Sequence, residues 1–279
     1  MAEQSLGTVG LIGAGSLAQA FAHGLLESGR LAPQQLLFNH RGDPGRLRRM
    51  LALGARHAAR KEELCRLAEI IVLAVKPHDL VAACRELRPC IAPRHLIVSL
   101  AAGVPTSAVA RALGPGLRIV RAMPNTSSAI GASATAVVRG GSTAVADSLQ
   151  AAALLAPLGA VEFVEEGQMD AVTALSGSGP AYVYLVLESL IDAGVAVGLS
   201  KEIARALVLQ TVYGAARMAL ESGVEPAELR RRVSSPGGTT IAALGVLEEA
   251  GVRRSFLRAV GRARERAGDL ARGALAMDV

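Results

Sequence analysis

The first 166 residues alternate short apolar segments with longer segments whose apolar positions recur at helical spacing. Short runs rich in Val, Ile and Leu are typical of buried strands, and parallel strands need helical crossovers between them. The pattern therefore predicts an α/β domain built on a doubly wound parallel sheet. The expected strands are Thr8 to Gly13, Leu36 to Asn39, Ile70 to Val75, Leu96 to Leu100, Arg118 to Ala122, Ala134 to Arg139 and Val161 to Phe163.

The strand pattern stops near Gly167, and helical segments separated by Gly, Ser and Pro clusters follow it. We therefore expect two domains, an α/β domain over residues 1–166 and an all-helical domain over residues 167–279. The segment from Ala181 to Val195 is apolar on nearly every side, which indicates a helix buried more fully than one monomer allows. The second domain is therefore predicted to be a dimerisation domain of a homo-oligomer.

The first expected strand runs into a glycine-rich turn, G-A-G-S-L-A, and then into an Ala- and Leu-rich helix. Gly13 permits the tight turn, Gly15 lets a pyrophosphate approach the backbone, and Ala18 lets the helix pack on its strand. A plain turn is the structural alternative, but the strand-turn-helix context favours a dinucleotide site. The sequence thus predicts a Rossmann-type, NADP-binding first domain.

The end of the second expected strand indicates which dinucleotide is bound. The residues there are Asn39, His40 and Arg41, with Arg46 close by, and no Asp or Glu stands where one would bind the ribose 2′-hydroxyl of NAD. We therefore expect NADPH as the cofactor, with NADH as a weaker substitute.

A second anion site is predicted in the helical half, at the run S-S-P-G-G-T-T from Ser234 to Thr240. Pro236 ends one helix, the two glycines bring backbone N–H groups together, and Thr239 opens the next helix. Helix N-termini attract anions, so this turn suits a small carboxylate. An ordinary helix cap is the alternative.

Composition excludes several classes of protein. No uncharged apolar run reaches the roughly 18 residues that a membrane span needs, and the N-terminus has no basic leader, so we expect no membrane association and a cytoplasmic location. Cys65, Cys84 and Cys90 are odd in number and lack C-x-x-C spacing, which indicates packing thiols. The five histidines are scattered, so no metal site is expected.

The formal charge of +6 raises the question of a nucleic-acid partner. The basic residues between Arg253 and Arg272 alternate with apolar ones at helical spacing, as on a solvated helix face, and Phe256 is the single aromatic residue among them. We expect no nucleic-acid binding. An anionic cofactor and an anionic substrate also suit a basic protein.

Together with these two turns, four further local motifs follow the expected strands and open the helical half. They are V-K-P at residues 75–77, A-A-G at 101–103, M-P-N-T at 123–126 and S-G-S-G-P-A-Y at 176–182. In their order and spacing they resemble the pyrroline-5-carboxylate reductase family over nearly the whole chain. The resemblance implies NADPH-dependent reduction of 1-pyrroline-5-carboxylate to proline, the last step of proline synthesis.

The resemblance also implies residue roles. Cofactor contacts would come from Ile12, Gly13, Ala14, Gly15, Ser16, Leu17, Ala74, Val75, Lys76, Pro77, Ala101, Ala102 and Met123, beside the Asn39, His40 and Arg41 turn. Substrate contacts would come from Ser235, Gly238, Thr239 and Thr240, which match positions that bind the carboxylate and ring nitrogen. Glu166 matches an acidic residue that contacts the substrate amine, so Thr240 and Glu166 are the candidate catalytic residues.

One departure and three alternatives remain at this stage. Arg60, Lys61 and Glu62 stand where family members often carry an Asn, which puts an adenine-side contact in doubt. A β-hydroxyacid dehydrogenase would use a helix-borne lysine, and Lys201 is the only lysine in the second half. A related cyclic imine reductase fits the chemistry but leaves S-S-P-G-G-T-T unexplained. A dinucleotide-sensing module without catalysis is the alternative outside enzymes.

Overall fold

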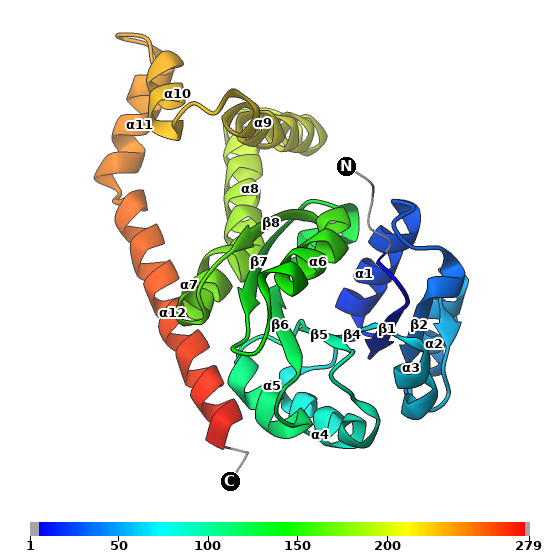
Figure 1. The fold of residues 1–279 in the computed structure, drawn as a ribbon. Helices are drawn as coiled ribbons and strands as arrows, with labels where there is room; N and C mark the ends of the chain where they lie inside the picture. Colours follow the sequence, from blue (N-terminus) through cyan, green and yellow to red (C-terminus); the bar gives the residue numbers. More distant parts are fainter. Residues whose placement is uncertain (1–5, 277–279) are drawn as a thin grey trace. The chain divides into compact units, whose positions relative to one another are not determined.

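The computed structural model describes residues 6–276, which form two compact units. The first unit contains the chain up to Ser178 and also the segment from Ala263 onward, and the second contains Gly179–Arg262. The first is an α/β unit and the second is entirely helical, as Figure 1 shows. The predicted α/β plus all-α fold is therefore confirmed.

The first unit is built on an eight-stranded sheet with the strand order β3-β2-β1-β4-β5-β6-β7-β8. The chain moves outward from β1 in one direction and then from β4 in the other, so the sheet is doubly wound. The strands are β1 Val9–Ile12, β2 Leu36–Asn39, β3 Arg56–His57, β4 Ile70–Leu73, β5 Leu96–Ser99, β6 Arg118–Met123, β7 Ser133–Arg139 and β8 Gly159–Phe163.

The central strands are apolar without alternation because both faces of the sheet are covered by helices. Every residue of β1, β2, β4 and β5 is buried. Phe21 and Leu154 belong to the core on one face, and Leu64 and Leu80 belong to the core on the other. The helices of the unit are α1 Ser16–Glu27, α2 Pro44–Ala52, α3 Lys61–Leu67, α4 Pro77–Leu87, α5 Thr106–Leu113, α6 Val145–Leu155 and α7 Met169–Val172.

Two details of the sheet differ from a purely parallel arrangement of the expected strands. Strand β3 was not expected, because Arg56 and His57 are exposed polar residues on an edge and carry no hydrophobic pattern. Strand β7 runs antiparallel to β6, with Arg121 opposite Val138. Its segment is as apolar as a parallel strand, so its direction is not visible in the pattern.

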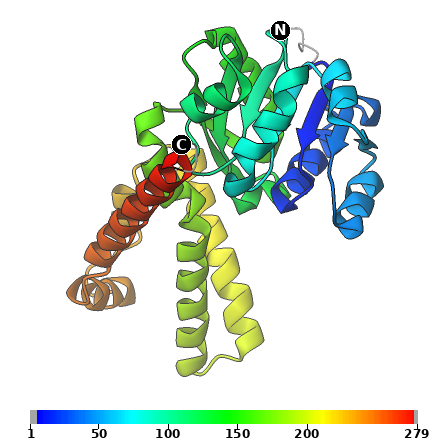
Figure 2. The same ribbon diagram turned by 90° about the horizontal axis from the view of Figure 1, so that it is seen from below.

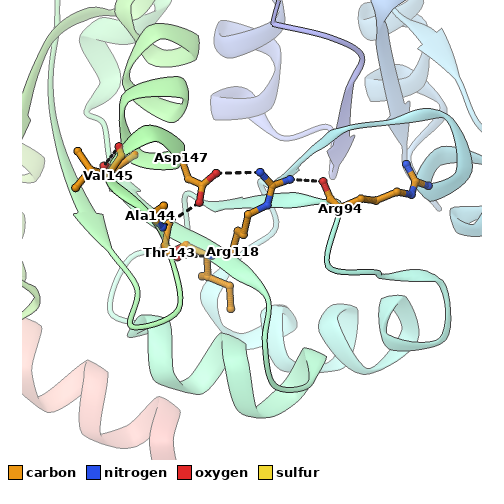
Figure 3. A network of polar contacts seen from close by, with 8 residues as sticks. Arg94, Arg118, Thr143, Ala144, Val145 and Asp147 are labelled. Carbon is orange, nitrogen blue, oxygen red and sulfur yellow. Dashed lines mark hydrogen bonds and ion pairs between the residues drawn. The ribbon is translucent and has the colours of Figure 1, made fainter.

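A polar network fixes the amino-terminal end of β6, on the opposite edge of the sheet from the carboxyl ends of the parallel strands (Figure 3). Arg118 Nη1 donates to Asp147 Oδ1 at 2.9 Å, and the other oxygen of Asp147 accepts from the Ala144 N–H at 3.0 Å. Thr143 Oγ1 accepts from the Ile119 N–H at 2.8 Å and donates to its carbonyl. These contacts hold the start of α6 beside β6.

The second unit begins with two long helices, α8 Gly179–Ala196 and α9 Lys201–Ser222, which lie side by side in Figure 2. Their backbones approach closely, since a Cβ added to Gly194 would lie 2.9 Å from Ala204 Cβ. Ser200 caps α9, and Lys201 at its first position is exposed. The helices α10 Pro226–Arg232, α11 Thr239–Glu249 and α12 Val252–Ala276 follow, and α12 continues into the first unit.

The second unit exposes apolar side chains along both long helices. Within the single chain no residue of α8 is buried, and the exposed large side chains include Val183, Tyr184, Leu185, Leu207 and Tyr213. Contiguous apolar surface of this kind marks a protein-protein contact. Among residues 6–276, no helix combines the length and the apolarity that crossing a membrane requires.

Candidate cofactor and substrate sites

The glycine turn after β1 has the backbone geometry that an anion site needs. Gly13 has a φ of +112°, and a Cβ there would lie 2.6 Å from the Ala74 carbonyl oxygen. A Cβ on Gly15, by contrast, would meet no atom within 4 Å, so the backbone is open at this point. Gly15 is the N-cap of α1 and no side chain caps that helix. The first N–H groups of α1 are therefore available to a phosphate.

A cavity of about 800 Å³ runs along the carboxyl edge of the sheet from β2 across β1 and β4 to β5. A dinucleotide laid across the glycine turn places one half over β2 and the other half toward β4 and β5. The lining residues from these strand ends are Ile12 to Leu17, Asn39 to Arg41, Ala74 to Asp79 and Leu100 to Ala102.

The β2 end of this cavity is basic. Arg41, Arg46 and Lys61 line it, and the Lys61 side chain is about nine-tenths buried. Asn39 Nδ2 donates to the carbonyls of Ala58 and Ala59 at 2.8 and 3.3 Å, which holds the segment before α3 against β2. The structure therefore places Lys61 at the β2 end of the cavity, beside the Asn39 to Arg41 turn.

Glu86 on α4 is the acidic partner of these cations. Its carboxylate accepts a hydrogen bond from Lys61 Nζ and lies 3.6 Å from Arg41 Nη1. The hydrogen bond from Lys61, more than the charge of Arg41, holds the pKa of the Glu86 carboxyl below its usual range. The His40 Nε2 atom beside them is buried without a hydrogen-bond partner in the described part of the chain.

The structure brings nearly all the cofactor residues predicted from the sequence to one cavity. All of them except Met123 line it, which supports their assignment, although their contact with a cofactor remains a prediction. Arg46 and Lys61 also line it, and Lys61 belongs to the segment Arg60 to Glu62 that departs from the family pattern. Glu86 was not predicted, because it lies in the last turn of a helical segment and no local motif marks it.

Met123 lies at the end of β6, where two motifs meet in the first unit. A Cβ on Gly177 would lie 2.8 Å from the Met123 methyl group, so this glycine makes room for it. Asn125 Nδ2 donates to the Ser176 carbonyl at 3.1 Å. The M-P-N and S-G-S-G-P motifs therefore contact each other. A nicotinamide contact by Met123 stays a prediction.

Glu166, predicted to contact the substrate amine, binds residues of the first unit. Its Oε2 accepts from the Thr106 N–H at 3.0 Å and from Thr106 Oγ1 at 2.7 Å, and its Oε1 accepts from Arg121 Nη1 at 2.5 Å. Both carboxylate oxygens thus have partners. A contact of Glu166 with the substrate amine stays a prediction.

The predicted carboxylate site in the second unit is a tight turn at the start of α11. Gly237 has a φ of +70°, and the Gly238 N–H donates to the Ser235 carbonyl at 3.0 Å. Gly238 is the N-cap of α11 and no side chain caps that helix. The N–H groups of Thr239 and Thr240 therefore suit an anion, and the Thr240 hydroxyl lies on the same turn.

No group of three or more His, Cys, Asp or Glu side chains in the described residues is placed to hold a metal ion. The donors assembled here are amide N–H groups, hydroxyls and basic side chains, which bind anions.

Two family models match separate parts of the chain. Residues 166–270 match the family model described as "Pyrroline-5-carboxylate reductase dimerisation". Residues 8–103 match the model described as "NADP oxidoreductase coenzyme F420-dependent".

Individual relatives agree with these models. A pyrroline-5-carboxylate reductase of Pseudomonas aeruginosa is 41% identical, and the alignment covers 94% of this chain and 96% of the relative. The solved pyrroline-5-carboxylate reductase of Coxiella burnetii is 37% identical, with a TM-score of 0.90 over 95% of this chain and 98% of that one. The Plasmodium falciparum pyrroline carboxylate reductase solved with NADP bound is 30% identical, with a TM-score of 0.85 over 96% and 99%.

Proposed function

This chain belongs to the pyrroline-5-carboxylate reductase family, and we propose that it uses NADPH in preference to NADH to reduce 1-pyrroline-5-carboxylate to proline. It is an NAD(P)H-dependent oxidoreductase of proline synthesis. When bound, the cofactor would supply a hydride to the imine carbon of the ring, which becomes C5 of proline, and a proton would be added to the ring nitrogen. The protein supplies binding, orientation and a dry site.

The basic β2 end of the cavity is the observation that supports the NADPH preference. A ribose 2′-phosphate carries charge that an acidic residue at the end of β2 would repel, and the chain has Asn39, His40 and Arg41 there. Lys61 adds a largely buried ammonium. Charge-assisted hydrogen bonds to phosphate are about twice as strong as neutral ones.

We assign the pyrophosphate to the turn from Ile12 to Leu17 and the nicotinamide half to the residues at the ends of β4 and β5. The cavity supports this assignment because it joins the glycine turn to Ala74 to Pro77 and to Ala101 and Ala102. The free N–H groups at the start of α1 suit the pyrophosphate charge.

The substrate carboxylate is assigned to the turn at the start of α11. The carboxylate would be held by Ser235, Gly238 and Thr239. The Thr240 hydroxyl would form a hydrogen bond with the ring nitrogen, which is the atom that gains a proton in the reaction. The uncapped N-terminus of α11 supports this proposal.

A homo-oligomer is part of the proposal. The match to a dimerisation model and the exposed apolar residues of α8 and α9 support an interface made by a second copy of the chain. No disulfide joins Cys65, Cys84 and Cys90, and reduced thiols would fit the cytoplasmic location predicted from the sequence.

One assay tests the proposal. NADPH and NADH oxidation would be followed by absorbance with pyrroline-5-carboxylate and with a six-membered cyclic imine carboxylate. We expect a higher kcat/KM with NADPH and with the five-membered substrate. Equal kcat/KM for the two cofactors would refute the NADPH preference, and cofactor binding without turnover would indicate a sensing protein.

A further inference from the structure

We propose that Glu166 is a positioning residue, which acts on hydride transfer by fixing the segment from Leu100 to Thr106, whose first three residues line the nicotinamide half of the cavity. The inference rests on the proposed function. It gives Glu166 a role without substrate contact.

The first observation is that Glu166 caps a helix far from it in sequence. Helix α5 begins at Thr106, and its N-cap residue is Pro105, which has no side-chain acceptor. The Glu166 carboxylate supplies the missing acceptor from 60 residues away, at 3.0 Å from the Thr106 N–H and 2.7 Å from Thr106 Oγ1. A carboxylate at a helix N-terminus also interacts favourably with the helix dipole.

The second observation is that the segment from Leu100 to Thr106 is anchored at both of its ends. At its upstream end the segment is fixed by the Leu100 N–H, which donates to the Leu73 carbonyl at 3.0 Å. At its downstream end it is fixed by Glu166 through Thr106. Ala101 and Ala102, which lie between the two anchors, line the cavity, so their position depends on both.

The third observation explains why Glu166 stays in place. Arg121 on β6 is only 4% exposed, and its Nη1 lies 2.5 Å from Glu166 Oε1. Its Nε and Nη2 atoms have no hydrogen-bond partner in the described residues, so within these residues Glu166 is its ion-pair partner. Since a buried guanidinium needs an opposite charge, the ion pair with Arg121 holds the Glu166 carboxylate beside β6.

Positioning matters for this reaction because a hydride is transferred only over a short distance. The donor and acceptor carbons must approach to about 3 to 3.5 Å, and a misplacement of about 1 Å can cost on the order of a hundredfold in rate. If the segment from Leu100 to Thr106 lost its contact with Glu166, the distance between donor and acceptor carbons would no longer be fixed. The structure thus links the carboxylate of Glu166 to the geometry of the cavity wall.

Thr106→Val is the main test, since it removes one hydrogen bond to Glu166 and leaves the Arg121 ion pair intact. Thr106→Ser restores the hydroxyl and is the conservative variant. Thr143→Val is the matched control, because the buried Thr143 hydroxyl makes two hydrogen bonds, and both go to the backbone of Ile119 and neither to Glu166 (Figure 3). Glu166→Gln is the second variant, and its fold would be checked by thermal unfolding.

Four quantities would be measured with the intact protein: kcat, KM, the isotope effect with 4-deuterated NADPH, and the dissociation constant of 2′,5′-ADP, which lacks the nicotinamide half. For Thr106→Val we expect a fall in kcat of about tenfold, a larger isotope effect and unchanged 2′,5′-ADP binding. Thr106→Ser should return kcat to within about twofold. Thr143→Val should lower stability and leave kcat and the isotope effect unchanged.

The contrary result has two parts. Thr106→Val would leave kcat and the isotope effect unchanged, and Glu166→Gln would lose activity and alter the pH profile of kcat/KM. That outcome would show that Glu166 contacts the substrate and would overturn the inference. All effects are ratios to the unmodified protein with whichever nicotinamide cofactor it uses. A failure of the NADPH preference would therefore leave this test intact.

Discussion

Lys61 and Glu86 form an ion pair inside the cofactor cavity, 25 residues apart in sequence and on different helices. The ammonium is nearly buried and the carboxylate is half exposed. An incoming phosphate would meet a cation that already has an anionic neighbour. Lys61 should therefore increase the selectivity for NADPH over NADH, and Glu86 should decrease it.

Lys61→Met should weaken the preference for NADPH over NADH by about ten- to a hundredfold, because a hydrogen bond to a charged group is worth about 1.5 to 3 kcal/mol. The measurement is the ratio of kcat/KM values for the two cofactors. Arg60→Met is the control, since Arg60 is exposed and pairs with Glu62 outside the cavity. An unchanged ratio in Lys61→Met together with a reduced ratio in Arg41→Ala would place the phosphate on Arg41 alone.

Glu86→Gln should strengthen the NADPH preference, because it removes a negative charge beside the phosphate. We expect about a two- to fivefold gain, which is the scale of a partly exposed charge interaction of up to about 1 kcal/mol. The binding constants of NADP⁺ and NAD⁺, measured by calorimetry, check this. Glu62→Gln is the control, and a loss of NADP⁺ affinity in Glu86→Gln would mean that Glu86 chiefly holds Lys61 in place.

Thr240→Ala should lower kcat/KM for pyrroline-5-carboxylate by about ten- to a hundredfold and leave NADPH binding nearly unchanged, since about 1.5 to 3 kcal/mol of hydrogen bonding is lost. Gly238→Val should be more severe, because its Cβ would lie 2.6 Å from Ser235 Oγ. Steady-state kinetics and cofactor binding would be measured for both. Weaker NADPH binding with full kcat/KM would assign this turn to the cofactor instead.

Leu185→Asp should dissociate the oligomer. Leu185 on α8 is 64% exposed in the single chain, so a charge costs little in a monomer but would be buried without a partner in an interface. Sedimentation velocity should show a lighter species than the unmodified protein. Leu51→Asp, on an exposed position of α2, is the control, and an unmodified protein that sediments as a monomer would contradict the proposed interface.

His95 should make folding stability depend on pH. Its ring is fully buried, with Nδ1 accepting from the Ala92 N–H at 2.9 Å and Nε2 facing the Cys65 carbonyl at 2.9 Å. Burial is the main cause that lowers the pKa of His95, and the positive charges of Arg94 and Arg118 add to it. The ring is therefore neutral in the fold and resists protonation.

The sign of this effect follows from proton linkage. Below about pH 6.5 the unfolded chain takes up a proton that the folded chain does not, so the free energy of unfolding falls as the pH is lowered from there to the folded pKa. Urea unfolding between pH 7.5 and 5 would measure the slope, and His95→Gln should flatten it. His23→Gln is the control, because His23 occupies an exposed position on α1. If His95→Gln had the same slope as the unmodified protein, His95 would not be the cause of the pH dependence.

The sheet and the glycine turn could be predicted from the sequence because their signals are local. The strands β1, β4 and β5 are short uninterrupted apolar runs, and Gly13 and Gly15 stand in one turn. Residues that follow strand ends could also be placed, since parallel strands end at one edge. This is why the predicted cofactor residues other than Met123 lie together in a single cavity.

Contacts between distant segments could not be predicted in this way. Glu86 meets Lys61 across 25 residues, and Glu166 meets Thr106 across 60. In sequence each is an ordinary glutamate, and its partner is decided by how helices pack on the sheet. The resemblance to the family suggested a substrate contact for Glu166, whereas the fold reveals an ion pair and a helix cap that no local pattern encodes.

Helix α12 has a consequence for the order in which the protein folds during synthesis. Its segment from Ala263 belongs to the first unit, where Ala267 is buried and a Cβ on Gly103 would lie 3.7 Å from the Ala271 nitrogen. The ribosome makes the whole of residues 179–262 before this segment, which takes on the order of 10 s at roughly 5 to 20 residues per second. Until then the α/β unit has an uncovered face beside Gly103, which nascent-chain chaperones would be able to bind.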